Sequence, residues 1–142
     1  DLTDRDSPLA RVSRNVVLEI TERTALEEVS DITTRVARLR DMGYRLAVDD
    51  LGAGYSGLAS FTRIEPDVVK LDMSLVRGVD VSPLKQSVVR SVLGLAGELA
   101  IDVVSEGIEV PAERDALMGL GCRLFQGFLF GRPERGFGRP RL

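Results

Sequence analysis

The sequence predicts an α/β fold of about five parallel strands with intervening helices. Short apolar runs alternate along the chain with longer segments of helical period. Their order is strand, helix, strand, turn, strand, helix, strand, helix and strand, which favours parallel pairing with right-handed crossovers. The 142 residues, 44% of them hydrophobic, are enough to bury a core.

The apolar runs are predicted to be the strands. They cover residues 16–20, 46–48, 68–71, 102–104 and 124–125. Apolar residues dominate these runs instead of alternating with polar ones, so each strand is expected to be buried on both faces.

The longer segments have the apolar spacing of helices. The first starts near Leu26 and ends at Met42, and Gly43 follows as a stop signal. The last opens at Pro111 and is closed by Gly121.

The helix between them is predicted to begin with Ser82 as N-cap and Pro83 in the first turn. Its core-facing stripe is expected to be Leu84, Val88, Val92, Leu95 and Leu99. Four glutamates on the predicted helices are expected to be solvated: Glu27, Glu28, Glu98 and Glu113.

The composition excludes several classes of function. Nineteen basic and 22 acidic residues give a net charge of -3, so duplex nucleic acid is not an expected partner. Histidine is absent, so carboxylates, lysine and bound ions must carry any catalysis. The single cysteine, Cys122, excludes an internal disulfide and is predicted to be a small core residue.

No linker or repeat divides the chain, and only the polar or Gly/Pro-rich ends, 1–14 and 134–142, are expected to be loose. The sequence has no signal peptide and no apolar run long enough to span a bilayer. A cytoplasmic location is therefore predicted, which leaves open a parent protein that is anchored in a membrane.

Two adjacent carboxylates, Asp49 and Asp50, stand at the end of the second predicted strand. Such a pair is most easily kept ionised by divalent cations or basic groups. Gly52 and Gly54 follow and would let the next backbone fold back beside this site.

Every predicted strand ends in polar groups, and the carboxyl ends of parallel strands meet on one face. These groups are Glu19 and Glu22, Asp49 and Asp50, Lys70 and Asp72, Glu106 and Glu109, and Gln126. Lys70 lies inside an apolar run, so it is expected to point at anions or at the carboxylates.

Each group has a structural alternative when taken alone. Glu19 or Glu22 could complement a helix dipole, and Asp50 could be a turn residue. Lys70 could be a structural partner of Asp49 or Asp72. The two spaced glycines alone are weak support for phosphate binding.

The motifs together resemble the EAL-domain family of cyclic-di-GMP phosphodiesterases. They are VLEITE at 17–22, DDLGAGYS at 49–56, KLD at 70–72, VSEGIE at 104–109 and QGFLFGRP at 126–133. The resemblance implies part of a (β/α)8 TIM-type barrel that uses two Mg2+ or Mn2+ ions to hydrolyse cyclic-di-GMP to linear pGpG.

The resemblance also implies residue roles. Glu19, Asp49, Asp50 and Glu106 match metal ligands, with Glu106 also a candidate base. Lys70 matches the lysine that contacts the attacking water and the phosphate. The remaining matches are supporting residues: Gln126 near the second ion, Glu22 bracing the loop that holds Gly52, Gly54, Tyr55 and Ser56, and the polar Asp72 and Glu109.

The sequence departs from the family pattern in two ways. The Glu-Ala-Leu motif and the arginine and asparagine expected after it are absent, so residues 1–142 are interpreted as the C-terminal portion of one EAL domain. Leu51, Ala53, Gly57 and Ser105 replace the usual phenylalanine, threonine, serine and alanine, without removing a ligand.

The parent domain is therefore predicted to be an active hydrolase, and this piece alone is predicted to be unstable and inactive. One alternative is a catalytically silent EAL domain that serves as a cyclic-di-GMP receptor or protein-interaction module. Another, a flavodoxin-like receiver, is disfavoured because Glu19 precedes the acidic pair. In this family, homodimers and adjacent sensory or GGDEF domains are common.

Overall fold

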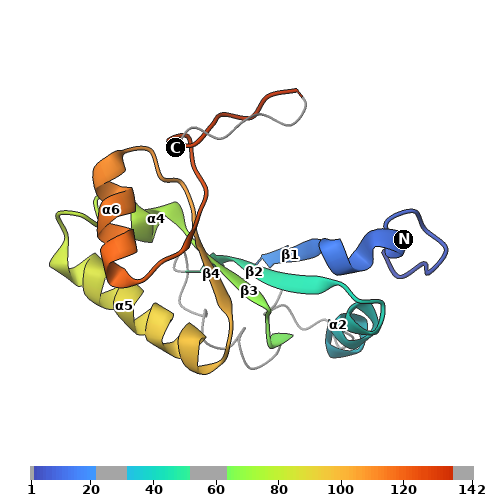
Figure 1. Cartoon of the computed structure of the whole chain (residues 1–142). Coiled ribbons are helices and arrows are strands. Elements are labelled where there is room, and N and C mark those ends of the chain that lie inside the picture. The colour runs from blue at the N-terminus through green and yellow to red at the C-terminus, as the bar shows by residue number, and fades with distance from the viewer. Residues whose placement is uncertain (1, 22–31, 52–63, 136–142) are drawn as a thin grey trace. The chain divides into compact units, whose positions relative to one another are not determined.

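The computed structural model describes residues 2–21, 32–51 and 64–135 (Figure 1). The chain divides into two compact units, Asp1–Val69 and Lys70–Leu142. The strands follow one another in the sheet in the order β1-β2-β3-β4-β5. Strand β3, Val68–Leu71, begins in the first unit and ends in the second.

The first unit contains the 3-10 helix η1 (Ala10–Asn15), β1 (Val17–Thr21), α2 (Ile32–Asp41) and β2 (Arg45–Leu51). Strands β1 and β2 pair in parallel, with Glu19 opposite Ala47 and Thr21 opposite Asp49. Gly43 follows α2 with a φ of 93°, a conformation that side chains with a Cβ rarely adopt. The predicted stop at Gly43 is confirmed.

The core of the first unit forms where α2 packs on β2. Val36, Leu46, Val48 and Ile64 are its buried members, and Leu18 of β1 packs against them. Burying a side chain of this size contributes about 1.5–3 kcal/mol. Ile32, Val36 and Leu39, which are spaced four and three residues apart, form the face of α2 that packs on this core.

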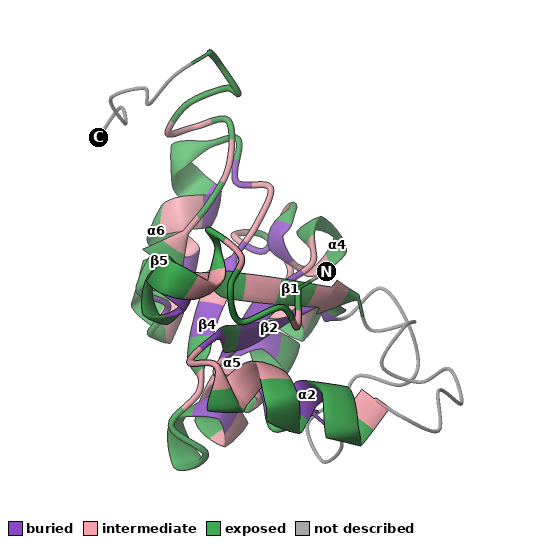
Figure 2. Ribbon diagram, turned by 90° about the vertical axis from the view of Figure 1, so that its right-hand side faces the viewer, coloured by how far each residue is buried: buried purple, intermediate pink, exposed green. Residues whose placement is uncertain are grey.

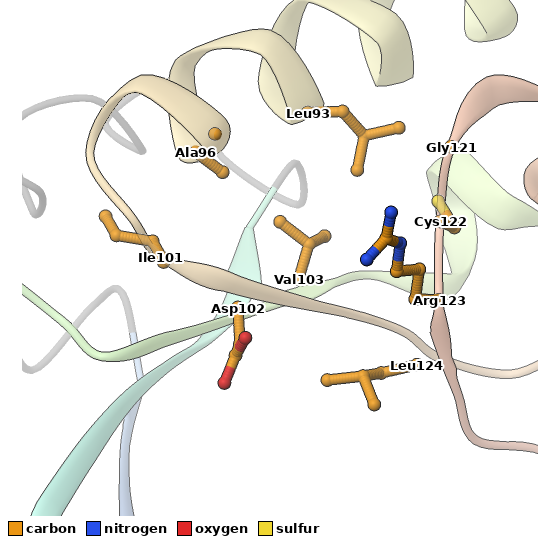
Figure 3. A pocket seen from close by; sticks show the side chains of 10 residues that line it. Leu93, Ala96, Ile101, Asp102, Val103, Gly121, Cys122, Arg123 and Leu124 are labelled. Carbon is orange, nitrogen blue, oxygen red and sulfur yellow. The ribbon is translucent and has the colours of Figure 1, made fainter.

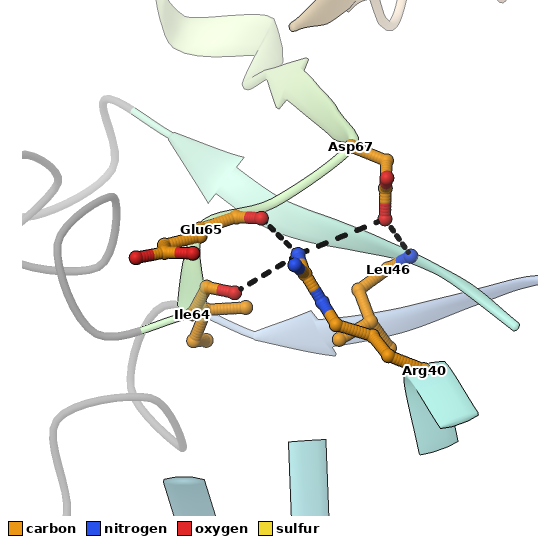
Figure 4. A network of polar contacts seen from close by, with 5 residues as sticks. All are labelled: Arg40, Leu46, Ile64, Glu65 and Asp67. Carbon is orange, nitrogen blue, oxygen red and sulfur yellow. Dashed lines mark hydrogen bonds and ion pairs between the residues drawn. The ribbon is translucent and has the colours of Figure 1, made fainter. Parts of the chain in front are cut away.

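Arg40, at the end of α2, ties this helix to the chain just before β3 (Figure 4). Its guanidinium donates to the carbonyl oxygens of Ile64, at 3.2 Å, and of Glu65. Asp67 lies 3.9 Å from the same group and accepts a 2.9 Å hydrogen bond from the backbone of Leu46 in β2. Arg40 thus ties α2 to the segment before β3, and Asp67 ties that segment to the amino end of β2.

The second unit contains α4 (Met73–Val76), α5 (Pro83–Glu98), β4 (Asp102–Ser105), α6 (Pro111–Leu120) and β5 (Leu124–Phe125). Strands β4 and β5 pair in parallel, with Val104 opposite Leu124. The short helix α4 is an element that the sequence reading missed.

Helix α5 starts as predicted but turns another face to the core. Ser82 caps it by accepting from the backbone of Lys85, and Pro83 occupies its first turn. The residues that α5 buries are Val89 and Ala96. The predicted stripe is wrong at three positions, since Leu84, Val88 and Leu99 are 75%, 39% and 52% exposed.

The strands are buried unequally, so the prediction of burial on both faces is wrong for the outer ones (Figure 2). All four residues of β3 are buried, whereas β1 and β5 contain none that is fully buried. The reason is their place in the sheet: β1 and β5 are its edge strands.

The first 14 residues are less loose than predicted. Residues Ala10–Asn15 form η1, and the buried Ser13 donates a side-chain hydrogen bond to the carbonyl of Met42. This contact fastens η1 to the end of α2. Cys122 is 5% exposed, which confirms the prediction of a core cysteine.

Candidate active site

In the first unit, Glu19 and Asp49 lie on the same face of neighbouring strands. Residues that pair in a parallel ladder point to one face, as do residues two apart along a strand. Glu19 pairs with Ala47, and Asp49 lies two residues beyond Ala47. The carboxylate of Glu19 is exposed and that of Asp49 is half-buried.

Asp50 occupies an unusual backbone conformation at the end of β2. Its φ is 62°, in the left-handed region that aspartate tolerates better than most residues. Its N–H donates a 3.0 Å hydrogen bond to Oδ1 of Asp49. Strand β2 continues to Leu51, so the two carboxylates lie inside it and not after it.

In the second unit, Lys70 of β3 forms an ion pair with Glu106, which follows β4. Lys70 Nζ lies 2.8 Å from Glu106 Oε1, and the two side chains are 9% and 19% exposed. A buried ammonium group is costly unless a carboxylate compensates it. The expectation that Lys70 points at a carboxylate is confirmed, and Glu106 is the partner.

The segment that follows β4 is fixed by backbone hydrogen bonds on both sides. The N–H of Glu106 donates to the carbonyl of Leu71 in β3, at 3.2 Å. The N–H of Ile108 donates to the carbonyl of Gln126 at 3.2 Å, and the carbonyl of Ile108 accepts from Leu129 at 3.0 Å. The carboxyl ends of β3, β4 and β5 are thus joined around Glu106.

Two glycines permit this close packing. Gly107 has a φ of 72°, and a Cβ on it would lie 2.7 Å from Cβ of Met73. A Cβ on Gly127 would overlap the backbone of Ile108. Both positions therefore need glycine for steric reasons.

Asp72 acts as the N-cap of α4. Its carboxylate accepts a 2.8 Å hydrogen bond from the backbone of Ser74. Burial pushes the pKa of Asp72 upward, but hydrogen bonds from the Ser74 hydroxyl and from the backbone of Ser74 and Met73 outweigh it and hold the pKa below its ordinary value. These contacts give Asp72 a local structural role.

Glu113 is a residue that the sequence reading placed wrongly. It was expected to be solvated but is 7% exposed. Its two oxygens accept from the backbone N–H groups of Gly78, at 3.0 Å, and Glu109, at 3.3 Å. Glu109 itself pairs with Arg77. Its position in the sequence could have indicated this role. Glu113 is the third residue of a helix that has no side-chain N-cap, and a glutamate there can accept from backbone N–H groups before the helix.

The other predicted site residues have simpler outcomes. Gln126 has an exposed side chain, and its backbone joins β4, donating to the carbonyl of Ser105 at 2.9 Å. Glu98 is exposed as predicted. The remaining predictions fall outside the described residues: Glu22, Glu27, Glu28, Gly52, Gly54, Tyr55 and Ser56.

The donor types at the strand ends suit a hard divalent cation. Carboxylate oxygens are the ligands that Mg2+ and Mn2+ prefer, and Glu19 and Asp49 present them on one sheet face. Within the described parts of the chain, no group of three or more acidic, cysteine or histidine side chains stands close enough together to hold a metal. Glu19 and Asp49 therefore fit a divalent cation in the chemistry of their oxygens and in their shared sheet face.

A cavity of about 340 Å³ lies elsewhere in the second unit (Figure 3). It is lined by α5, by 101–103 and by 121–124. These residues surround the amino ends of β4 and β5, whereas Glu106 and Gln126 follow the carboxyl ends. The cavity is distinct from the candidate site.

In the described residues, no helix has the length and apolar character needed to cross a membrane.

Comparison with known proteins places these features in a family. The family model described as EAL domain matches residues 8–133. The cyclic di-GMP phosphodiesterase RocR of Pseudomonas aeruginosa is 40% identical over 119 residues, which are 84% of this chain and 30% of RocR. The chain spans less than a third of the length of RocR and of similar curated relatives.

Solved structures also match this chain. Klebsiella pneumoniae BlrP1, in a complex with calcium and cyclic-di-GMP, matches with a TM-score of 0.85 and 43% identity over 90% of this chain and 33% of that chain. A cyclic-di-GMP-bound standalone EAL protein of Vibrio cholerae matches with a TM-score of 0.82 and 33% identity. The match covers 91% of this chain and 55% of that chain. These matches confirm the predicted fold class, a parallel α/β part of a TIM-type barrel.

Proposed function

Because the chain belongs to the EAL domain family, we propose that it supplies part of the active site of a phosphodiesterase that hydrolyses cyclic-di-GMP to linear pGpG. The observation that carries this proposal is the ion pair of Lys70 and Glu106 at neighbouring strand ends. Support comes from RocR, a relative named as a cyclic di-GMP phosphodiesterase, and from BlrP1, solved with cyclic-di-GMP.

In the proposed reaction, a water oxygen attacks phosphorus and the bond from phosphorus to the 3′ oxygen breaks. Oε1 or Oε2 of Glu106 accepts one proton of the water, and the departing 3′ oxygen takes a proton from solvent. The Lys70 ammonium group, held by Glu106, orients the attacking water and donates to a phosphate oxygen. A positioned acid-base group of this kind contributes roughly 10²–10⁴-fold to the rate.

The proposed cofactors are two Mg2+ or Mn2+ ions held by Glu19, Asp49, Asp50 and Glu106. When bound, such ions lower the pKa of the attacking water and offset negative charge on the phosphate. The protein's contribution is to present these carboxylates from β1, from β2 and from the residue that follows β4. The manganese complex of BlrP1 with cyclic-di-GMP, 44% identical over 85% of this chain and 31% of that chain with a TM-score of 0.82, supports divalent metal use in the family.

Several finer roles stay predictions. They are the place of Gln126 near the second ion and the bracing by Glu22 of the loop with Gly52, Gly54, Tyr55 and Ser56. A homodimer and an adjacent sensory or GGDEF domain are also predictions.

We further propose that the active unit is longer than these 142 residues. The Glu-Ala-Leu motif, the arginine and the asparagine of the family pattern are absent from the sequence. The 142-residue chain alone is expected to show negligible turnover. Hydrolysis by this chain at a rate comparable to that of a complete domain would contradict this.

The test uses the domain extended upstream by the segment that carries the missing motifs. Glu106→Gln should lower kcat for cyclic-di-GMP at least about a hundredfold, measured by chromatographic separation of cyclic-di-GMP and pGpG. Glu98→Gln is the control, since Glu98 is exposed on α5. Undiminished turnover in Glu106→Gln would refute the proton-accepting role. Binding of cyclic-di-GMP without turnover in the unaltered domain would instead favour a receptor.

A further inference from the structure

The buried carboxylate of Glu113 connects two separate segments of the second unit. Oε1 accepts a hydrogen bond from the N–H of Gly78, between α4 and α5, at 3.0 Å. Oε2 accepts from the N–H of Glu109, between β4 and α6, at 3.3 Å. Glu113 is 7% exposed, so water cannot easily replace either contact.

A third contact links the same two segments. The guanidinium of Arg77 pairs with Oε1 of Glu109. Arg77 precedes Gly78, and Glu109 supplies the N–H that Glu113 holds. The backbone of Glu109 is therefore held from α6 by Glu113, and its side chain is held from the end of α4 by Arg77.

Glu109 lies three residues after Glu106, and the residues between them have little freedom. Gly107 is packed against Met73, and the backbone of Ile108 is hydrogen-bonded at both its N–H and its carbonyl. The residues between Glu109 and Glu106 thus form a short and rigid connection.

We propose that Glu113 is a positioning residue that holds the 106–109 segment so that Glu106 faces Lys70. The catalytic consequence rests on the proposed function, in which Glu106 accepts a proton. The requirement for glutamate follows from the contacts, because both carboxylate oxygens accept hydrogen bonds. Glutamine has the same length but only one acceptor oxygen, so its NH2 group would face a backbone donor.

The first test is kinetic and uses the extended domain. Glu113→Gln should lower kcat about tenfold, the usual size for a group that orients a site residue, with KM for cyclic-di-GMP within about twofold. Glu113→Ala should lower kcat further, so that glutamine partly rescues it. The control Glu98→Gln should change neither constant. An unchanged kcat, or a kcat loss matched by the unfolded fraction, would overturn the proposal.

The second test needs no catalysis and also uses the extended domain. Glu113→Gln should speed amide hydrogen exchange at Gly78 and Glu109 and shift the carboxyl carbon resonance of Glu106 and the ammonium resonance of Lys70. Unchanged resonances of Glu106 and Lys70 would overturn the positioning role whether or not the domain hydrolyses cyclic-di-GMP. Shifted resonances in a domain without turnover would sustain it and refute only the proposed function.

Discussion

Lys70 of β3 and Glu106, directly after β4, form an ion pair of 2.8 Å with side chains that are 9% and 19% exposed. The backbone joins the same two strand ends, because the N–H of Glu106 donates to the carbonyl of Leu71. The proposed proton acceptor is thus held through both its backbone and its carboxylate. The contact that should stabilise these two strand ends is also the one that carries the proposed function.

Removing the charge of Lys70 should destabilise the chain. Lys70→Met leaves the carboxylate of Glu106 without its buried partner, which typically costs about 3–5 kcal/mol. Urea unfolding should show a loss of this order. Arg90→Met, an exposed position on α5, is the control. A double variant Lys70→Met/Glu106→Leu should recover much of the lost free energy of unfolding. An unchanged free energy of unfolding in Lys70→Met would contradict the burial of the pair.

Alanine at Gly107 should be more harmful than alanine at Gly78. Both glycines have similar φ values, 72° and 66°, so the conformational cost of about 1–2 kcal/mol is shared. Only Gly107 would place its Cβ 2.7 Å from Met73; at Gly78 the nearest side-chain atom is 4.0 Å away. Overpacking adds about 1–3 kcal/mol. Equal free energies of unfolding for Gly107→Ala and Gly78→Ala would refute the close contact with Met73.

The N-cap formed by Asp72 should make a pH-dependent contribution to stability. Asp72→Ala is expected to cost about 1 kcal/mol at neutral pH. The pKa of Asp72 is below its ordinary value of 3.8 in the folded chain, because Ser74 and Met73 stabilise the carboxylate. The contribution is therefore full above about pH 5 and is lost as the pH falls through the folded pKa.

The measurement for Asp72 is urea unfolding of the wild type and Asp72→Ala from pH 6 to pH 2. The difference in free energy of unfolding should shrink below pH 3.8, whereas the exposed control Asp115→Ala should have little effect at pH 6. A difference that grows on acidification would contradict the lowered pKa.

Cys122 should react slowly with thiol reagents. Burial raises the pKa of its thiol above the ordinary 9.0, and the hydrogen bond that Ser105 donates at 3.3 Å opposes this only in part. Modification by iodoacetamide should be slow in the native chain and become ordinary in urea. Ser105→Ala should displace the pH profile of modification still further upward. A native rate equal to the unfolded rate would show that Cys122 is accessible.

Local signals in the sequence correctly predicted where helices begin and end and that Lys70 faces a carboxylate. Gly43 and Gly121 end their helices, Ser82 caps α5, and a lysine inside an apolar run faces a carboxylate. In each case the physical cause lies within a few residues, in a φ value, a cap or the cost of burying a charge. The parallel direction of the strands followed from the alternation of strands and helices along the chain.

Features that depend on tertiary packing could not be predicted. Leu84 and Val88 share the spacing of a core stripe, yet the face that α5 buries contains Val89 and Ala96. Glu113 was predicted to be solvated because it lies on a helix; its partners, Gly78 and Glu109, come from segments outside that helix. Helical periodicity gives a face, but only the neighbouring elements decide which face is covered.

The most direct test of the proposed active site is hydrolysis of cyclic-di-GMP by the extended domain with and without Asp49→Asn, in Mg2+ or Mn2+ buffer. Asparagine keeps the shape of Asp49 but removes a charge proposed to hold the ions. The domain should convert cyclic-di-GMP to pGpG, and Asp49→Asn should abolish this conversion while the fold, followed by circular dichroism, is retained. Full metal-dependent hydrolysis by Asp49→Asn would contradict the proposed site.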